Sequence, residues 1–187
     1  TKLDDTRRIF AGTTTKFYEL SAGAWVDSGG VYTGGADTRW SIAQFGNSTL
    51  ASNYTDTIQR STGAGFSAVS GAPKAKLLVA SKGFVMALAT NDGTYGDSPD
   101  RWWCSALLNV TDWTPAIATQ CATGRLIGGS GPINAAVRFG DDIVAYKAGA
   151  MFVGRYEGAP AVWAWTQASN DVGCAGGDAV VDTPIGH

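Results

Sequence analysis

Charged and titratable side chains are scarce in this sequence of 187 residues. Lysine, arginine, aspartate and glutamate make up 16% of the chain, and the only histidine is His187, the last residue. Acid–base and nucleophilic catalysis need a base beside the reacting group, and histidine is the commonest such base. The carboxylates are scattered, and the only glutamates are Glu19 and Glu157. We therefore predict a non-enzymatic protein with no catalytic residues, no cofactor-binding residues and no metal site.

Basic side chains are not in excess either. The formal net charge is −2 at pH 7, and lysine and arginine are spread along the chain. A nucleic-acid-binding surface normally gathers a basic excess on one face. The charge pattern argues against a protein that binds nucleic acid directly.

Long apolar runs are missing as well. The longest candidates, residues 77–80 and 84–89, are interrupted by Lys82 and Gly83, and a membrane span needs about 18 apolar residues. The chain begins TKLDDTRR, without an initiator methionine or the apolar core of a signal peptide. We expect no membrane association, and we expect residues 1–187 to be a segment of a longer propeller that does not fold stably alone.

Cysteine is limited to Cys104, Cys121 and Cys174, with no C-x-x-C spacing and no histidine nearby in sequence. This pattern does not suit a zinc site. One disulfide bond remains an alternative whose pairing the sequence does not define. Buried free thiols in a reducing compartment are favoured.

Turn residues and β-formers are abundant, and their clearest pattern spans residues 136–156. Apolar and aromatic residues flank the turn Gly140-Asp141-Asp142, and a second turn follows at residues 147–149. Short β-rich runs separated by such turns predict antiparallel hairpins.

This hairpin pattern recurs in the chain. The segment FGNSTLA (residues 45–51) matches FGDDIVA (residues 139–145) in residue class, and both units end on an arginine, Arg60 or Arg155. A weaker copy occupies residues 81–89. Equivalent glycines occur at positions 46, 83 and 140, close to the interval of about 40–50 residues typical of propeller blades. The polar stretch 91–100 lengthens the second interval.

About fifteen short strands and no helix are predicted from the apolar alternation and the turn residues. We expect strands at residues 7–11, 16–20, 24–26, 38–45, 49–52, 56–60, 65–69, 77–80, 84–89, 101–107 and 125–128, on both sides of Asp141-Asp142, and at 151–156 and 162–167. The fold class is therefore a single all-β domain over 1–187 with antiparallel repeat architecture. A β-propeller or part of one is favoured, and a β-sandwich is the alternative.

The core should contain the most apolar hairpin, residues 77–80 and 84–89. Its strands are almost continuously apolar, which is typical of strands covered on both faces. We expect Leu78, Phe84, Met86 and Ile143 to be buried.

Two acidic segments are candidates for chemistry, and both have simpler explanations. Asp141 and Asp142 could form a metal or acid–base site, but paired aspartates in a turn mostly bond the backbone. Residues 91–100 contain three carboxylates and could hold calcium, but their spacing differs from the EF-hand pattern and falls one residue short of the sialidase Asp-box. We interpret the first as a turn and the second as a solvated loop.

Tryptophans could provide a platform for sugars. Trp163 and Trp165 are two residues apart and should share one strand face in the core. Trp102 and Trp103 are adjacent and should point to opposite faces, so that one of them could meet a neighbouring sheet or a partner chain. The glycine-rich stretch 128–131 is only a weak candidate for phosphate binding, because no GK[ST] follows it.

The second half of the chain contains, in order, Trp103-Cys104-Ser105, the segment NVTDW (109–113), the segment GRLIG (124–128) and the hairpin at 137–156. This order resembles the β-propeller structural proteins of tailed bacteriophages. It looks similar to the packaged-DNA-stabilising tail hub of short-tailed phages. The resemblance implies packing motifs and no catalytic residues, although members of that family usually have more blades.

Two functions follow as expectations. The first is a non-enzymatic structural component of a bacteriophage virion, in the tail or head-to-tail connector. Such a protein would form a homo-oligomeric ring, contact other virion proteins and meet packaged DNA only indirectly. The second is a carbohydrate-binding or carbohydrate-active propeller, in which exposed Trp102 or Trp113 would stack on a sugar.

Overall fold

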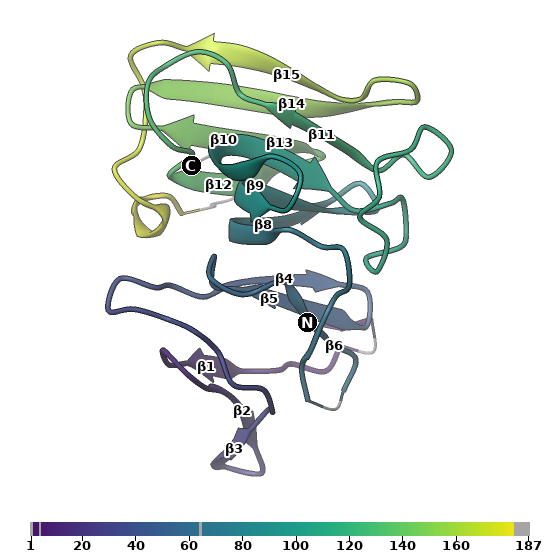
Figure 1. The fold of residues 1–187 in the computed structure, drawn as a ribbon, viewed down its shortest axis with the longest axis vertical. Coiled ribbons are helices and arrows are strands. Elements are labelled where there is room, and N and C mark those ends of the chain that lie inside the picture. Colours follow the sequence, from purple (N-terminus) through teal and green to yellow (C-terminus); the bar gives the residue numbers. More distant parts are fainter. Residues whose placement is uncertain (1, 4, 64, 182–187) are drawn as a thin grey trace.

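The computed structural model describes residues 2–3, 5–63 and 65–181. Its strands form four antiparallel sheets that follow one another along the chain (Figure 1). Sheet 1 contains β1 (Phe10–Gly12), β2 (Phe17–Ser21) and β3 (Ala24–Asp27). Sheet 2 contains β4 (Ser41–Phe45), β5 (Ser48–Ser52), β6 (Gln59–Ser61) and β7 (Ser67–Ala68). Sheet 3 contains β8 (Lys74–Ser81), β9 (Phe84–Asp92), β10 (Gly96–Cys104) and β11 (Ala122–Arg125). Sheet 4 contains β12 (Ala135–Phe139), β13 (Asp142–Lys147), β14 (Ala150–Gly158) and β15 (Val162–Ser169).

Within every sheet, strands that are consecutive in sequence are also neighbours in space. The all-β antiparallel repeat architecture is therefore confirmed. Each predicted strand overlaps an observed one, and the only helical element in the described residues is a short 3-10 turn, η1 (Gly177–Ala179). The described strands close into neither a barrel nor a propeller, so this open stack fits part of a propeller or packed sandwich layers.

One predicted boundary was wrong. Residues 91–100 were expected to form a solvated loop, but β9 continues to Asp92 and β10 begins at Gly96. The two strands pair Gly96 with Asp92 and Asp97 with Asn91. The polar side chains of this segment belong to an extended hairpin whose tip is exposed, and apolar alternation therefore could not mark it.

The sheets pack face to face, with sheet 3 between sheets 2 and 4 (Figure 1). Along β9, Phe84, Met86 and Leu88 face sheet 4, while Val85 and Ala87 face sheet 2. This period of two puts apolar residues on both faces because each face meets another sheet. The expected burial of Leu78, Phe84, Met86 and Ile143 is confirmed.

Serine side chains join sheet 2 to the edge strand β8. Ser52 Oγ donates to the carbonyl oxygen of Ala75 at 2.5 Å and accepts from its N–H at 3.2 Å. Ser41 Oγ accepts from the backbone N–H of Leu78 at 2.9 Å. A sheet edge exposes backbone groups that must be satisfied when buried, and these polar residues satisfy them.

The repeat inferred from sequence has a matching structure. The segments around Gly46, Gly83 and Gly140 all form the turn between the first and second strands of a sheet. In sheet 2, Arg60 Nε donates to Ser48 Oγ at 3.0 Å, and in sheet 4, Arg155 Nε donates to Asp142 Oδ2 at 3.0 Å. The two arginines thus bond the first residue of the second strand in both copies.

The two ends of the stack are finished differently. The far face of sheet 4 is covered by residues near Cys174, which pack on Val144 and Tyr146. Backbone bonds hold this cover in place, since Cys174 N donates to Lys147 O at 2.8 Å. Sheet 1 forms the opposite end of the stack (Figure 1).

Candidate functional site

The acidic pair at the β12–β13 turn serves the fold. Asp141 lies 2.6 Å from Lys82 Nζ, and Asp142 lies 3.0 Å from Arg155 Nε. The hydrogen bond from Lys82 holds the pKa of Asp141 below its usual value. Asp141 lies in the turn as predicted, whereas Asp142 begins β13, and both carboxylates pair with basic side chains where backbone hydrogen bonds were expected.

The three carboxylates of residues 91–100 have separate partners. Asp92 Oδ1 accepts from the backbone N–H groups of Thr94 and Tyr95, both at 2.8 Å, and so caps the hairpin turn. Asp97 accepts a hydrogen bond from the hydroxyl of Tyr54. Asp100 pairs with Arg125 at 2.7 Å. Within the described residues, no group of three or more histidine, cysteine, aspartate or glutamate side chains could hold a metal ion.

The tryptophans considered for sugar binding, Trp102, Trp103, Trp113, Trp163 and Trp165, pack in the core. Trp102 faces sheet 4, where its ring centroid is 6.0 Å from that of Trp165, and Trp103 faces sheet 2. Trp163 is buried and Trp165 packs beside it, so the predicted orientations are confirmed. The prediction that Trp102 or Trp113 is exposed for stacking on a sugar was wrong, because these side chains are only 6% and 2% exposed. Both faces of sheet 3 are covered, and neither ring can stack on a sugar.

The cysteines are buried free thiols, as expected. Burial raises the pKa values of Cys104 and Cys121 to about 12. In the glycine-rich stretch, the carbonyl oxygen of Gly129 accepts from Lys147 Nζ at 3.2 Å. That loop therefore offers a carbonyl group to a buried lysine. His187 lies outside the described residues.

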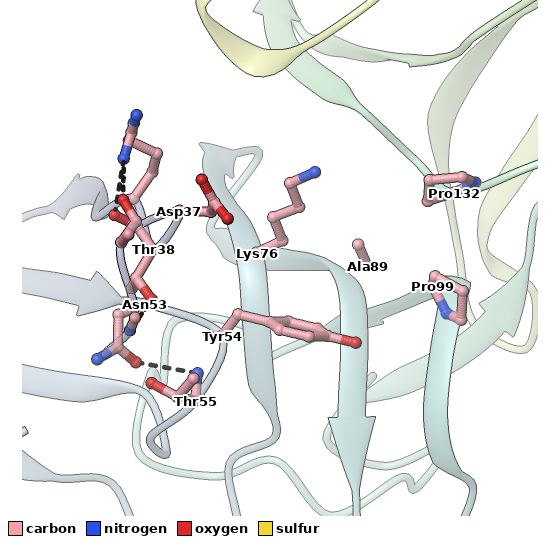
Figure 2. Close-up of a pocket in the computed structure, with 12 residues that line it drawn as sticks. Asp37, Thr38, Asn53, Tyr54, Thr55, Lys76, Ala89, Pro99 and Pro132 are labelled. Carbon is pink, nitrogen blue, oxygen red and sulfur yellow. Dashed lines mark hydrogen bonds between the residues drawn. The ribbon is translucent and has the colours of Figure 1, made fainter. Parts of the chain in front are cut away.

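A cavity with a volume of about 510 Å³ lies between sheets 2 and 3, beside the connection that leads to sheet 4. Its walls come from the connections before β4, after β5 and before β12, together with Lys76, Ala89 and Pro99 of sheet 3. Figure 2 shows Tyr54 reaching across this space toward Pro99, with Asp37 and Lys76 near one another above the ring in this view.

Local backbone geometry shapes this cavity. Tyr54 has φ of 70° and Ala89 has φ of 53°, which are left-handed values that side chains other than glycine rarely adopt. Asn53 supports the Tyr54 turn, because its Oδ1 accepts from the N–H groups of Thr55 at 3.2 Å and Asp56 at 2.9 Å. Strained residues of this kind gather at binding sites and switch regions, which makes the cavity a candidate site.

The Tyr54 hydroxyl is fixed as well. Burial and its hydrogen bond to Asp97 raise the pKa of Tyr54 to about 12, so the hydroxyl remains protonated at neutral pH and donates to the carboxylate. Tyr54 could not be predicted from the sequence, because a left-handed tyrosine leaves no trace in apolar periodicity. The Asn-Tyr-Thr-Asp stretch at 53–56, which favours Asx turns, was the one available signal.

A second candidate is the outer face of sheet 1, formed by Ile9, Leu20 and Trp25. Leu20 pairs with Trp25 across β2 and β3, and its N–H donates to the carbonyl oxygen of Ile9 at 2.9 Å, so the three side chains share one face. They are 54%, 36% and 51% exposed. The opposite face of β2 carries Phe17, which is fully buried.

No family model matches the sequence, and no curated protein matches it at a significant level. Among the described residues, none of the structure's helices has the length and apolar character that crossing a membrane requires.

Proposed function

We propose that this chain is a non-enzymatic structural component of a bacteriophage virion, in the tail or the head-to-tail connector. The observation that supports assembly with other subunits is the outer face of sheet 1, where Ile9, Leu20 and Trp25 are exposed at the end of a stack of sheets. An apolar face of this kind is typical of surfaces that meet another subunit.

The contacts within the chain suggest how subunits would meet. Sheet 3 is covered by sheet 2 on one face and sheet 4 on the other. A subunit that packs on sheet 1 would extend the same sheet-on-sheet pattern. Burial of apolar surface contributes about 25 cal/mol per Å², and the large side chain of Trp25 would supply much of it. When such contacts join different faces of identical subunits, they generate rings if the rotation closes.

The polar groups are also consistent with a structural role. Basic side chains pair with the carboxylates of Asp100, Asp141 and Asp142. Asp92 caps a turn. Carboxylates engaged in this way stabilise turns and strand pairs.

The virion assignment comes from the sequence resemblance. Two of its motifs contain Trp103 and Trp113, which pack together in the core between sheets 2 and 3. The net charge of −2 suits a protein that meets packaged DNA only indirectly, through other virion proteins.

The test is to purify the phage particles that a genome encoding this chain produces. We expect mass spectrometry to find the chain at a constant copy number per particle, and cryo-electron microscopy to place it in a ring at the tail or connector. Particles that assemble and infect without the chain would contradict the proposal.

A further inference from the structure

The Tyr54 ring is a fixed aromatic surface inside the cavity of about 510 Å³. Asp97 holds its hydroxyl, and Asn53 holds the turn that carries it. Small-molecule sites usually have volumes of about 300–1,000 Å³, so the space is large enough for a small ligand. A ring that is already fixed loses little conformational freedom when a ligand stacks on it.

Three charged side chains surround the cavity, and they differ in availability. The guanidinium of Arg39 donates to the carbonyl oxygens of Ala36 at 3.3 Å and Thr38 at 3.2 Å, so it is folded onto its own loop. Asp37 and Lys76 are exposed, and neither forms an ion pair with another described residue. An acceptor and a donor are therefore both available at the rim (Figure 2).

One side of the cavity is apolar, while Thr38, Asn53 and Thr55 line the side of the β4 and β5 connections. Ala89, Pro99 and Pro132 line the side of the cavity toward which Tyr54 reaches (Figure 2). None of their side chains donates or accepts a hydrogen bond. These walls suit the C–H groups of a ligand.

The combination of surfaces selects among ligand classes. An anion would meet the carboxylate of Asp37, and a purely apolar ligand would desolvate both charged groups without bonding them. A pyranose has an apolar C–H face that can stack on an aromatic ring, and its hydroxyl groups both donate and accept. We infer that this cavity binds a pyranose sugar, with the C–H face on Tyr54 and the hydroxyl groups bonded to Asp37 and Lys76. This binding activity goes beyond the structural role proposed above and does not depend on it.

The test begins with an array of immobilised neutral mono- and disaccharides, followed by calorimetric titration of each sugar that binds. In the variant Tyr54→Gly, the ring is removed while glycine adopts the left-handed backbone freely. We expect the affinity to fall by about tenfold or more, because the stacking surface is lost. Lys76→Met changes only an exposed side chain, and we expect it to weaken binding about threefold or more.

The matched control is Tyr95→Ala, which removes an exposed tyrosine that does not line the cavity. Its affinity for the sugar should equal that of the unmodified chain. Circular dichroism verifies that each variant is folded. If Tyr54→Gly does not fold, the affinity of Lys76→Met decides the test. The inference is overturned if no sugar on the array binds, if the folded variants keep full affinity, or if inorganic phosphate occupies the cavity while sugars do not.

Discussion

The two terminal sheets of the stack have similar inner faces and different outer faces. Sheet 4 packs Trp163 toward sheet 3, and sheet 1 packs Phe17 toward sheet 2. On the far side of sheet 4, Val144 and Tyr146 are buried beneath the segment around Cys174. On the far side of sheet 1, Trp25 is 51% exposed. The far face of sheet 4 is thus covered around Val144 and Tyr146, although Phe139 at its edge is 51% exposed, whereas the apolar side chains on the far face of sheet 1 are open.

This difference separates stability from assembly. Apolar residues on covered faces contribute to folding, because unfolding returns them to water. Apolar residues on the open face are already exposed to water, so unfolding changes their exposure little. They can contribute to the free energy of association when another subunit covers them. Substitutions at the two ends should therefore change different measured quantities.

The largest loss of stability is expected for a substitution in the interior of sheet 3. Phe84 is fully buried and its ring lies 5.4 Å from that of Tyr156 and 5.8 Å from that of Trp163. Phe84→Ala should lower the free energy of unfolding by about 3–5 kcal/mol, because it leaves a cavity. Urea unfolding measures this value, and a loss below about 1 kcal/mol would show that this strand is not central.

The outer faces of the terminal sheets give the next comparison. Val144 is 3% exposed beneath the covering segment, whereas Leu20 is 36% exposed on the open face. Val144→Ala should lower the free energy of unfolding by about 1.5–3 kcal/mol. Leu20→Ala removes more atoms, yet it should change the free energy by only about 0.5 kcal/mol. Equal losses in urea unfolding would remove the distinction between the two ends.

The inner faces should be equally intolerant of added volume. A Cβ on Gly154 would lie 2.8 Å from the ring of Trp165, and one on Gly12 would lie 2.0 Å from Trp40. Gly154→Ala and Gly12→Ala should each lower the free energy of unfolding by about 1–3 kcal/mol through overpacking. Gly149→Ala is the control, since nothing lies within 4 Å of its added Cβ. If the midpoint of thermal unfolding is unchanged in Gly12→Ala, sheet 1 packs loosely on both faces.

Sheet 1 is attached to sheet 2 partly by polar contacts. Arg8 pairs with Glu19 at 2.6 Å and also donates to Thr49 at 3.2 Å and Ser61 at 3.0 Å. Arg8→Met should lower the free energy of unfolding by about 1–2 kcal/mol, because these partly buried acceptors lose their partner.

The exposed pair of Lys16 and Asp27 on the same sheet is the control. Because solvent screens such a pair, Lys16→Met should leave the urea midpoint unchanged. If Arg8→Met also leaves it unchanged, the Arg8 contacts do not anchor the sheet.

Most of the strand order could be predicted from the sequence. Alternation around Phe84 and the turn at Gly140 reflect local side-chain periodicity, which the structure preserves. Adjacent Trp102 and Trp103 had to occupy opposite faces of a strand, but burial of both depended on sheets from distant parts of the chain. The hairpin at residues 91–100 was missed because its side chains are polar and exposed on a continued backbone ladder.

The cavity could not be predicted. Its lining is brought together by three connections that are distant in sequence. Its central residue Tyr54 has a left-handed φ, a conformation that a sequence predicts mainly where glycine occurs. The open face was missed for another reason. Leu20 and Trp25 look like ordinary core positions, and only the arrangement of the sheets leaves them without cover.

Sedimentation equilibrium of the chain and its Leu20→Asp/Trp25→Asp variant tests the assembly role of the open face most directly. Residues on this face contribute little to folding, so the variant should unfold at nearly the same urea concentration. We expect the unmodified chain to associate beyond its 19.4 kDa monomer mass, and we expect the variant to sediment as a monomer, because buried unpaired charges oppose the contact. An unmodified chain that remains monomeric at high concentration, or a variant that associates equally well, would contradict the account.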